Sequence, residues 1–74
     1  MSYSKERDLP KTTYDPDSGA AYIKLTRNPV KRQINDRATH VVVDLDADDK
    51  IVGVEIYANV PESLKQYPPP EGES

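Results

Sequence analysis

Hydrophobic positions in the second half of the chain fall into two runs separated by a short acidic segment. The runs are residues 40–45 (HVVVDL) and 51–57 (IVGVEIY), and the segment between them is residues 46–50 (DADDK). Val, Ile and Tyr favour the extended backbone, because branched and aromatic side chains pack well on a pleated surface. Two such runs around a short polar turn predict a β-hairpin.

The turn suggests a strand register. If residues 47–49 form a three-residue loop, Asp46 faces Lys50, and Asp49 takes the third loop position, where a left-handed backbone is needed. Pairing outward from that loop, we expect the strand partners Asp44–Val52, Val42–Val54 and His40–Ile56. One face of the hairpin then carries Val42, Val52, Val54 and Ile56, with Asp44 near the turn. The other carries Val41, Val43, Leu45, Ile51 and Tyr57, interrupted by Gly53 and Glu55. Both faces are largely apolar in this register, so both need cover.

Shorter strands are predicted before the hairpin. Residues 12–14 (TTY) and 20–26 (AAYIKLT) flank residues 15–19 (DPDSG), a strong turn signal because Asp, Pro and Gly each favour turn geometry. Ala21, Ile23 and Leu25 alternate with polar or aromatic neighbours, which is the period of a strand. Residues 30–34 (VKRQI) are more polar and suit a sheet edge, and residues 35–37 turn the chain into the hairpin.

The C-terminal part carries helix signals. Pro61 suits the first turn of a helix, residues 62–67 supply one or two turns, and residues 68–70 are three prolines that stop it. The fold class is therefore mainly β, a small antiparallel β-meander of four to five short strands with a short C-terminal helix. We divide the chain into a flexible leader (1–10), a single small β domain (11–67) and a flexible Pro-rich tail (68–74).

Four motifs resemble a known family. They are Tyr14-Asp15-Pro16, residues 21–25 (AYIKL), residues 42–46 (VVDLD) and residues 52–56 (VGVEI), in that order. Their order and spacing resemble the small bacterial family catalogued as domain of unknown function 2283, over roughly residues 12–58. That family often has Gly where this chain has Asp49. The resemblance implies a small β-meander, often with a short C-terminal helix. It brings no established activity, so it assigns no functional residues.

Size and composition narrow the function classes. The 74 residues include no Cys, which excludes disulfides, zinc–thiolate clusters and a thiol nucleophile. Because the chain has few large aliphatic residues, the hydrophobic core of a single copy supplies only marginal stability. No apolar run reaches the roughly 20 residues of a membrane span, and no signal-peptide core is present. We therefore expect a cytoplasmic protein without membrane contact.

Charge is unevenly distributed, although the net charge is only −3. Residues 24–43 carry five basic side chains against one acidic, whereas residues 44–74 carry eight acidic against two basic. The basic group consists of Lys24, Arg27, Lys31, Arg32 and Arg37, with Tyr22 as a neighbouring aromatic. Basic side chains with an aromatic neighbour are the minimal signal for nucleic-acid contact. A group of acidic side chains is the corresponding signal for docking onto a basic protein.

Candidate chemistry is sparse. Asp44, Asp46, Asp48 and Glu55 occupy positions of a calcium-loop pattern, but Asp49 replaces its essential Gly and the flanks are strands rather than helices. Weak cation binding by the carboxylates of the acidic turn 44–49 remains an open alternative to a purely structural turn. His40 is the only histidine and has no Cys or nearby base with which to form a metal site or nucleophile pair. We predict no enzyme, no cofactor, and no catalytic, cofactor-binding or metal residues.

Three functions remain in competition. The first is a protein-interaction module that self-associates, most simply as a homodimer, because the hairpin has more apolar surface than so small a chain covers. The second is an antitoxin-like acidic partner of a small basic toxin, with the carboxylates of residues 44–49 and Glu55 guiding association; such a role has been suggested for members of the resembled family by analogy. The third is nucleic-acid binding through the basic residues 24–37.

Overall fold

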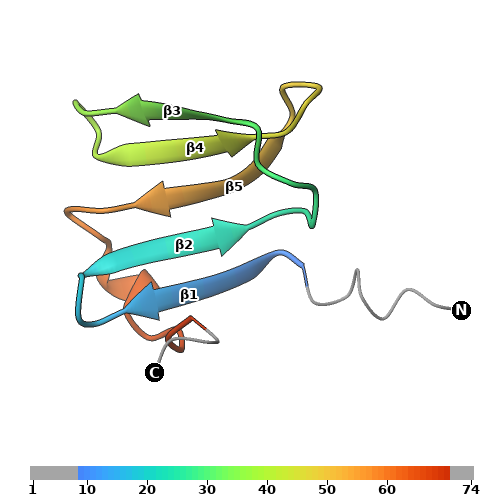
Figure 1. The fold of residues 1–74 in the computed structure, drawn as a ribbon. Coiled ribbons are helices and arrows are strands. Elements are labelled where there is room, and N and C mark those ends of the chain that lie inside the picture. The colour runs from blue at the N-terminus through green and yellow to red at the C-terminus, as the bar shows by residue number, and fades with distance from the viewer. Residues whose placement is uncertain (1–8, 71–74) are drawn as a thin grey trace, which may run out of the picture.

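The computed structural model describes residues 9–70, which form one five-stranded antiparallel sheet (Figure 1). Its elements are β1 (Lys11–Asp15), β2 (Ala20–Lys24), β3 (Arg32–Asp36), β4 (Val41–Leu45), β5 (Ile51–Ile56) and the 3₁₀ turn η1 (Glu62–Leu64). The predicted fold class is confirmed: the protein is mainly β, with five short antiparallel strands. The short C-terminal helix is a single 3₁₀ turn.

The strands lie in the order β1-β2-β5-β4-β3. A meander of all five strands would place β3 beside β2, whereas here β5 takes that place and the chain segment between β2 and β3 crosses to the far edge. The predicted edge position of the third strand is confirmed, and every residue of β3 is exposed. The sheet therefore consists of a β1–β2 hairpin and a three-stranded unit, β3–β4–β5, joined along β2 and β5.

The β1–β2 turn follows its sequence signal. The Asp15 carboxylate accepts a hydrogen bond from the Asp17 amide at 2.9 Å, and the Gly19 amide donates to the Asp15 carbonyl at 2.7 Å. Gly19 has a φ of 78°, the left-handed conformation for which Gly is preferred. This turn fixes which residues of β1 and β2 face each other.

The third strand and its turn differ from prediction. The strand begins at Arg32 rather than at residue 30 and runs through Asp36, so residues 35–37 are not the turn that was expected. The chain instead reverses at residues 37–40, and His40 closes this turn with a φ of 62°. A left-handed residue cannot continue a strand, which is why β4 starts at Val41.

The central hairpin has the predicted loop but a different register. Asp46 pairs with Lys50 through a 2.9 Å hydrogen bond, and Asp49 is left-handed at φ 63°, as expected. Beyond the loop, Asp44 pairs with Gly53 and Val42 with Glu55, so the predicted partners Val52 and Val54 are wrong by one residue. A β-bulge beside Leu45 inserts one extra residue into β5 and causes the shift.

The bulge decides which side chains share a face. Because alternation restarts beyond it, the β5 residues Val54 and Ile56 lie on the face of Val41 and Val43, not on that of Val42. Gly53 and Glu55 share the opposite face with Val42 and Asp44. The prediction of two largely apolar faces is therefore wrong. The sheet has one apolar face and one polar face.

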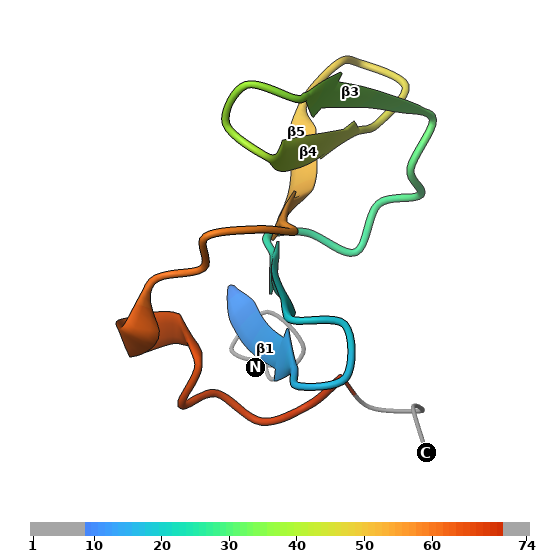
Figure 2. The ribbon, with the colours of Figure 1, turned by 90° about the vertical axis from the view of Figure 1, so that its left-hand side faces the viewer.

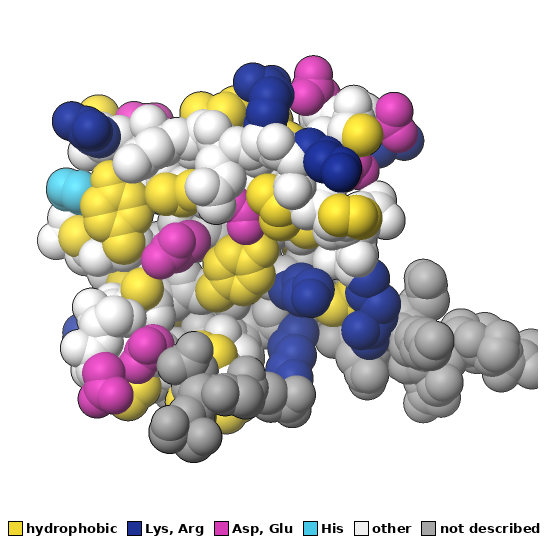
Figure 3. Space-filling view, viewed as in Figure 1, with side chains coloured by type: hydrophobic (Ala, Val, Ile, Leu, Met, Phe, Trp, Pro, Cys, Tyr) yellow, Lys and Arg dark blue, Asp and Glu magenta, His cyan; other side chains and the backbone are white. Residues whose placement is uncertain are grey.

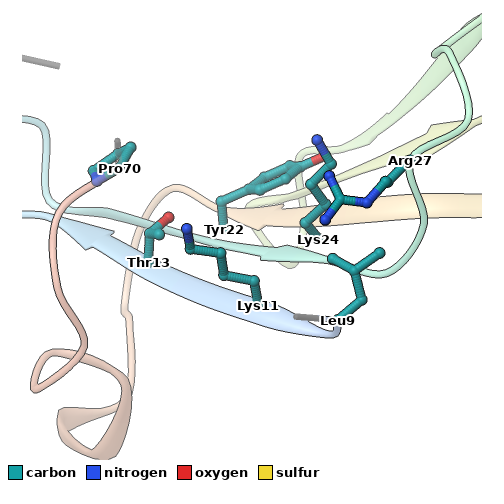
Figure 4. A pocket seen from close by; sticks show the side chains of 7 residues that line it. All are labelled: Leu9, Lys11, Thr13, Tyr22, Lys24, Arg27 and Pro70. Carbon is teal, nitrogen blue, oxygen red and sulfur yellow. The ribbon is translucent and has the colours of Figure 1, made fainter. Parts of the chain in front are cut away.

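The segment after β5 wraps around the β1 edge. Figures 2 and 4 show η1 on one side of the sheet and Pro70 on the other. Pro61 precedes η1 in an extended conformation, and the Tyr14 amide donates a 2.9 Å hydrogen bond to the Pro68 carbonyl. The outer edge of β1 is therefore partly capped by the chain itself. The predicted flexible leader and tail fall largely on residues 1–8 and 71–74, outside the described residues.

The core is small. Among residues 9–70 the buried hydrophobic side chains are Ala21, Leu45, Val52 and Val60. Most aliphatic side chains of β4 and β5 are only half-buried. No helix in this part of the chain has the length and apolar content needed to cross a membrane.

Candidate functional site

The apolar face carries a continuous row of side chains across all five strands. The pairings place Thr12 beside Ile23, Ile23 beside Val54, Val54 beside Val43 and Val43 beside Ile34. None of these five side chains is buried, and Ile34 is 47% exposed. An ordinary sheet packs one such face into a core. Here four of the five side chains are half-buried and Ile34 is exposed in the single chain.

The C-terminal segment covers only one end of this face. η1 packs beside β1, and the next row contains the fully buried Ala21, whose β5 neighbour is Ile56. Toward β3 that cover is lost, since β3 is exposed along its whole length and Val41 and Val43 are half-buried. The incompletely covered surface thus lies over β3 and the half-buried residues of β4 and β5, away from the buried Leu45 and Val52.

The polar face is organised by the buried carboxylate of Asp44. Its two oxygens accept hydrogen bonds from the Tyr22 hydroxyl and the Gln33 side-chain amide, each at 2.8 Å. Asp44 is only 7% exposed, so these bonds replace water that the carboxylate loses on folding. They also tie β2, β4 and β3 together through side chains.

Tyr22 lies across Gly53. A Cβ added to Gly53 would overlap the Tyr22 hydroxyl oxygen and lie 2.5 Å from the ring carbon Cζ, so only glycine leaves room for the ring. Burial of the phenol, together with its hydrogen bond to Asp44 and the charges of Asp44 and Glu55, raises the pKa of Tyr22 to about 12. The ring is therefore neutral at ordinary pH and held in one place.

A cleft of about 790 Å³ opens on the polar face beside Tyr22. Its lining combines three cationic side chains with a phenol, a hydroxyl and two apolar residues, namely Lys11, Lys24, Arg27, Tyr22, Thr13, Leu9 and Pro70. Figure 3 shows the basic side chains gathered over the ends of β1 and β2 away from their turn. Three of the seven lining side chains are thus cationic, and none is acidic.

The acidic hairpin turn is largely self-satisfied. The Asp46 carboxylate accepts hydrogen bonds from the backbone amides of Lys50 and Asp48 and from the Asn28 side chain, and these contacts lower the pKa of Asp46. Asp49 pairs with Arg32 at 3.1 Å. No three or more His, Cys, Asp or Glu side chains within the described chain are grouped to hold a metal ion. Asp44 and Asp46 are thus occupied by protein donors rather than presented to a partner.

Only two of the five basic residues singled out from the sequence line the cleft. Lys24 and Arg27 line the cleft, whereas Lys31, Arg32 and Arg37 are not among its lining residues. Lys11 completes the cleft and was missed, although the turn at residues 15–19 places it directly opposite Lys24. A register drawn from that turn would have found it.

His40 has a local structural environment. Its ring meets that of Tyr57 edge-on, with the ring centres 5.6 Å apart, and its Nδ1 lies 3.4 Å from the Asn59 side-chain amide. The Tyr57 hydroxyl in turn donates to Asn35 at 3.0 Å. These contacts tie the β3–β4 turn to the end of β5.

Comparison with known proteins gives a family and no activity. The model of the family described as Protein of unknown function (DUF2283) matches residues 11–58, which span all five strands. No curated protein and no solved structure matches the chain.

Proposed function

We propose that this chain, which belongs to the DUF2283 family, is a protein-interaction module that forms a homodimer through the apolar face of its sheet. The observation that carries the proposal is the incompletely covered row that ends at the half-buried Val54 and Val43 and the exposed Ile34. Contiguous apolar surface of this kind on a small protein is typical of an interaction site.

The size of the core supports the proposal. A domain of this length is marginal when its hydrophobic core is small, and here the buried hydrophobic residues are mostly Ala and Val. Covering Ile34, Val43 and Val54 would stabilise the fold by removing apolar area from water, at about 25 cal/mol per Å². Self-association is thus a source of stability that the single chain lacks.

A second copy is the simplest cover. Symmetric dimers dominate among soluble oligomers, and a two-fold axis brings the same surface of both copies together. Two sheets that stack face to face form a sandwich with the apolar side chains of both inside. Since the uncovered part spans only three short strands, the interface belongs to the small class, and we expect a dissociation constant in the micromolar range.

Ile34→Lys tests the proposal without disturbing the core. Ile34 lies on the edge strand and is exposed in the single chain, so the lysine is tolerated there but meets an apolar surface in the dimer. We expect dimer dissociation to rise at least about tenfold, because apolar contact is lost and a charge is desolvated. Val30→Lys is the matched control, since Val30 is similarly exposed, at 45%, but lies outside the strands.

Sedimentation equilibrium over protein concentrations of about 1 to 500 μM measures both variants and the parent chain. The proposal requires a monomer–dimer equilibrium in the parent, little change in Val30→Lys and a strong shift to monomer in Ile34→Lys. A parent chain that stays monomeric over the whole range contradicts it. So does equal weakening in the two variants.

A further inference from the structure

Two lysines face each other at the open end of the β1–β2 hairpin. Lys11 and Lys24 are direct cross-strand partners, and the neighbour of Lys24 on its other side is Gly53, which has no side chain. Figure 4 shows Lys11, Lys24 and Arg27 on one side of the sheet around the same cleft. The pairing places two cationic side chains next to each other in the wall of the cleft, so that an anion bound there would contact both.

The neutral lining of the cleft is arranged beside these charges. Thr13 and Tyr22 are the next pair on the same face, two residues along from Lys11 and Lys24. The Tyr22 ring is already fixed by its hydrogen bond to Asp44 and its position over Gly53. A flat group that packs against the ring therefore meets a surface that needs no ordering on binding, which favours affinity.

We infer that this cleft binds a nucleotide, with its phosphate groups at Lys11, Lys24 and Arg27 and its base against Tyr22. The volume of about 790 Å³ is within the range of small-molecule sites. Lysine and arginine are the usual phosphate partners, and an aromatic ring beside them accepts a base by stacking. The nucleotide is either free or a unit of a single strand, because both present the same chemistry.

Nearby carboxylates set the direction of binding. Asp44 and Glu55 lie on the same face as Tyr22, and Asp15 lies at the turn end of β1. Both Asp44 oxygens already accept hydrogen bonds within the protein. The phosphates therefore bind at the open end of the hairpin, away from Asp15 and Glu55, and the uncharged base points toward the middle of the sheet.

Amide NMR titration tests this inference. Inorganic tripolyphosphate, ATP and a short single-stranded oligonucleotide are each added to the parent chain at about 50 mM salt, where phosphate contacts are strong. We expect ATP or the oligonucleotide to shift the amides of Lys11, Thr13, Tyr22 and Lys24 and to bind at least about threefold more tightly than tripolyphosphate, because stacking adds to the charge contact. Tighter binding of ATP than of the oligonucleotide identifies a free nucleotide as the ligand, and the reverse order identifies a single strand.

The Lys24→Gln variant locates the site. Lys24 is exposed, so the substitution removes a charge with little effect on packing, and we expect about fivefold weaker binding of the tighter ligand. Lys31→Gln is the matched control, because it makes the same change outside the cleft and should leave the affinity unchanged. No shifts at about 5 mM ligand, tripolyphosphate binding as tight as ATP, or equal weakening in both variants would each overturn the inference.

Discussion

Replacing Gly53 with alanine tests the packing that organises the polar face. The added methyl group overlaps the Tyr22 hydroxyl oxygen and comes within 2.5 Å of Cζ, and it also lies 3.1 Å from the Ile23 carbonyl oxygen. The backbone carbonyl belongs to the neighbouring strand and has little freedom to move. The Tyr22 ring must therefore swing away, and it takes its hydroxyl away from Asp44.

The cost can be estimated from three contributions. Overpacking typically costs about 1–3 kcal/mol. A buried carboxylate that loses one of its donors costs about 1–3 kcal/mol, although Gln33 continues to donate to Asp44. Alanine in place of glycine in a strand returns about 0.5–1 kcal/mol. We expect a net loss of roughly 2 kcal/mol, which lowers the melting temperature by about 8–16 °C in a domain of this size.

Urea denaturation followed by circular dichroism measures the effect in a double-mutant cycle with Tyr22→Ala. Without the ring, Gly53→Ala meets no phenol and only the tight contact with the Ile23 carbonyl oxygen remains, which the strand preference of alanine offsets. We therefore expect a near-neutral effect, with a coupling of about 2 kcal/mol between the two sites. Gly19→Ala is the control glycine. It has nothing within 4 Å and should destabilise through its left-handed φ alone, independently of Tyr22.

One outcome of the double-mutant cycle would refute the packing of Tyr22 over Gly53. If Gly53→Ala costs the same free energy in the presence and in the absence of the Tyr22 ring, the ring does not lie over Gly53. The β5 register that places Gly53 beside Asp44 would then be wrong as well.

Two further substitutions test the hairpin turn and the buried phenol. Asp49→Gly relieves about 1 kcal/mol of left-handed strain, but the variant loses an exposed ion pair with Arg32 and its unfolded state gains entropy. We expect a net stabilisation of about 0.3 kcal/mol in thermal melts, the same with calcium and with chelator. A lower melting temperature would contradict this expectation. Because the pKa of Tyr22 is raised to about 12 on folding, the phenol loses its proton at about pH 10 in the unfolded chain but only near pH 12 in the folded chain. The contribution of the neutral phenol to the free energy of unfolding is therefore full below about pH 10 and is lost as the pH rises toward 12. The 295 nm absorbance of the folded chain should show an ionisation near pH 12 that is missing in Tyr22→Phe, and an unchanged titration curve would refute the assignment.

Much of the fold could be predicted from local sequence signals. The turn at residues 15–19 forms where Asp, Pro and Gly predict it, and the loop closed by Asp46 and Lys50 forms where the acidic segment between two apolar runs predicts it, because turn chemistry is local. The β3–β4 turn was misplaced, because its closing residue is His40, which gives no strong turn signal. Strand order depends on which edges meet across the chain, and no local pattern reports that β5 pairs with β2.

The candidate site was harder to predict because it depends on the bulge. One extra residue in β5 places Gly53 rather than Val52 beside Asp44, and only glycine makes room for Tyr22. The tyrosine was identified as an aromatic neighbour of basic residues, but its carboxylate partner is 22 positions away in the sequence. A contact of that range follows from register and not from composition.

The pairing of β2 with β5 also bears on how the chain reaches its fold. The β1–β2 and β4–β5 hairpins close over short turns, whereas Ala21 must find Ile56, 35 positions later in the sequence. The entropic free-energy cost of closing a loop grows with the length of the loop, by roughly 0.6 kcal/mol for each doubling. The two hairpins can therefore form before β2 and β5 meet. We therefore expect their docking along β2 and β5 to limit the folding rate, so that substitutions in that ladder slow folding more than substitutions in β3.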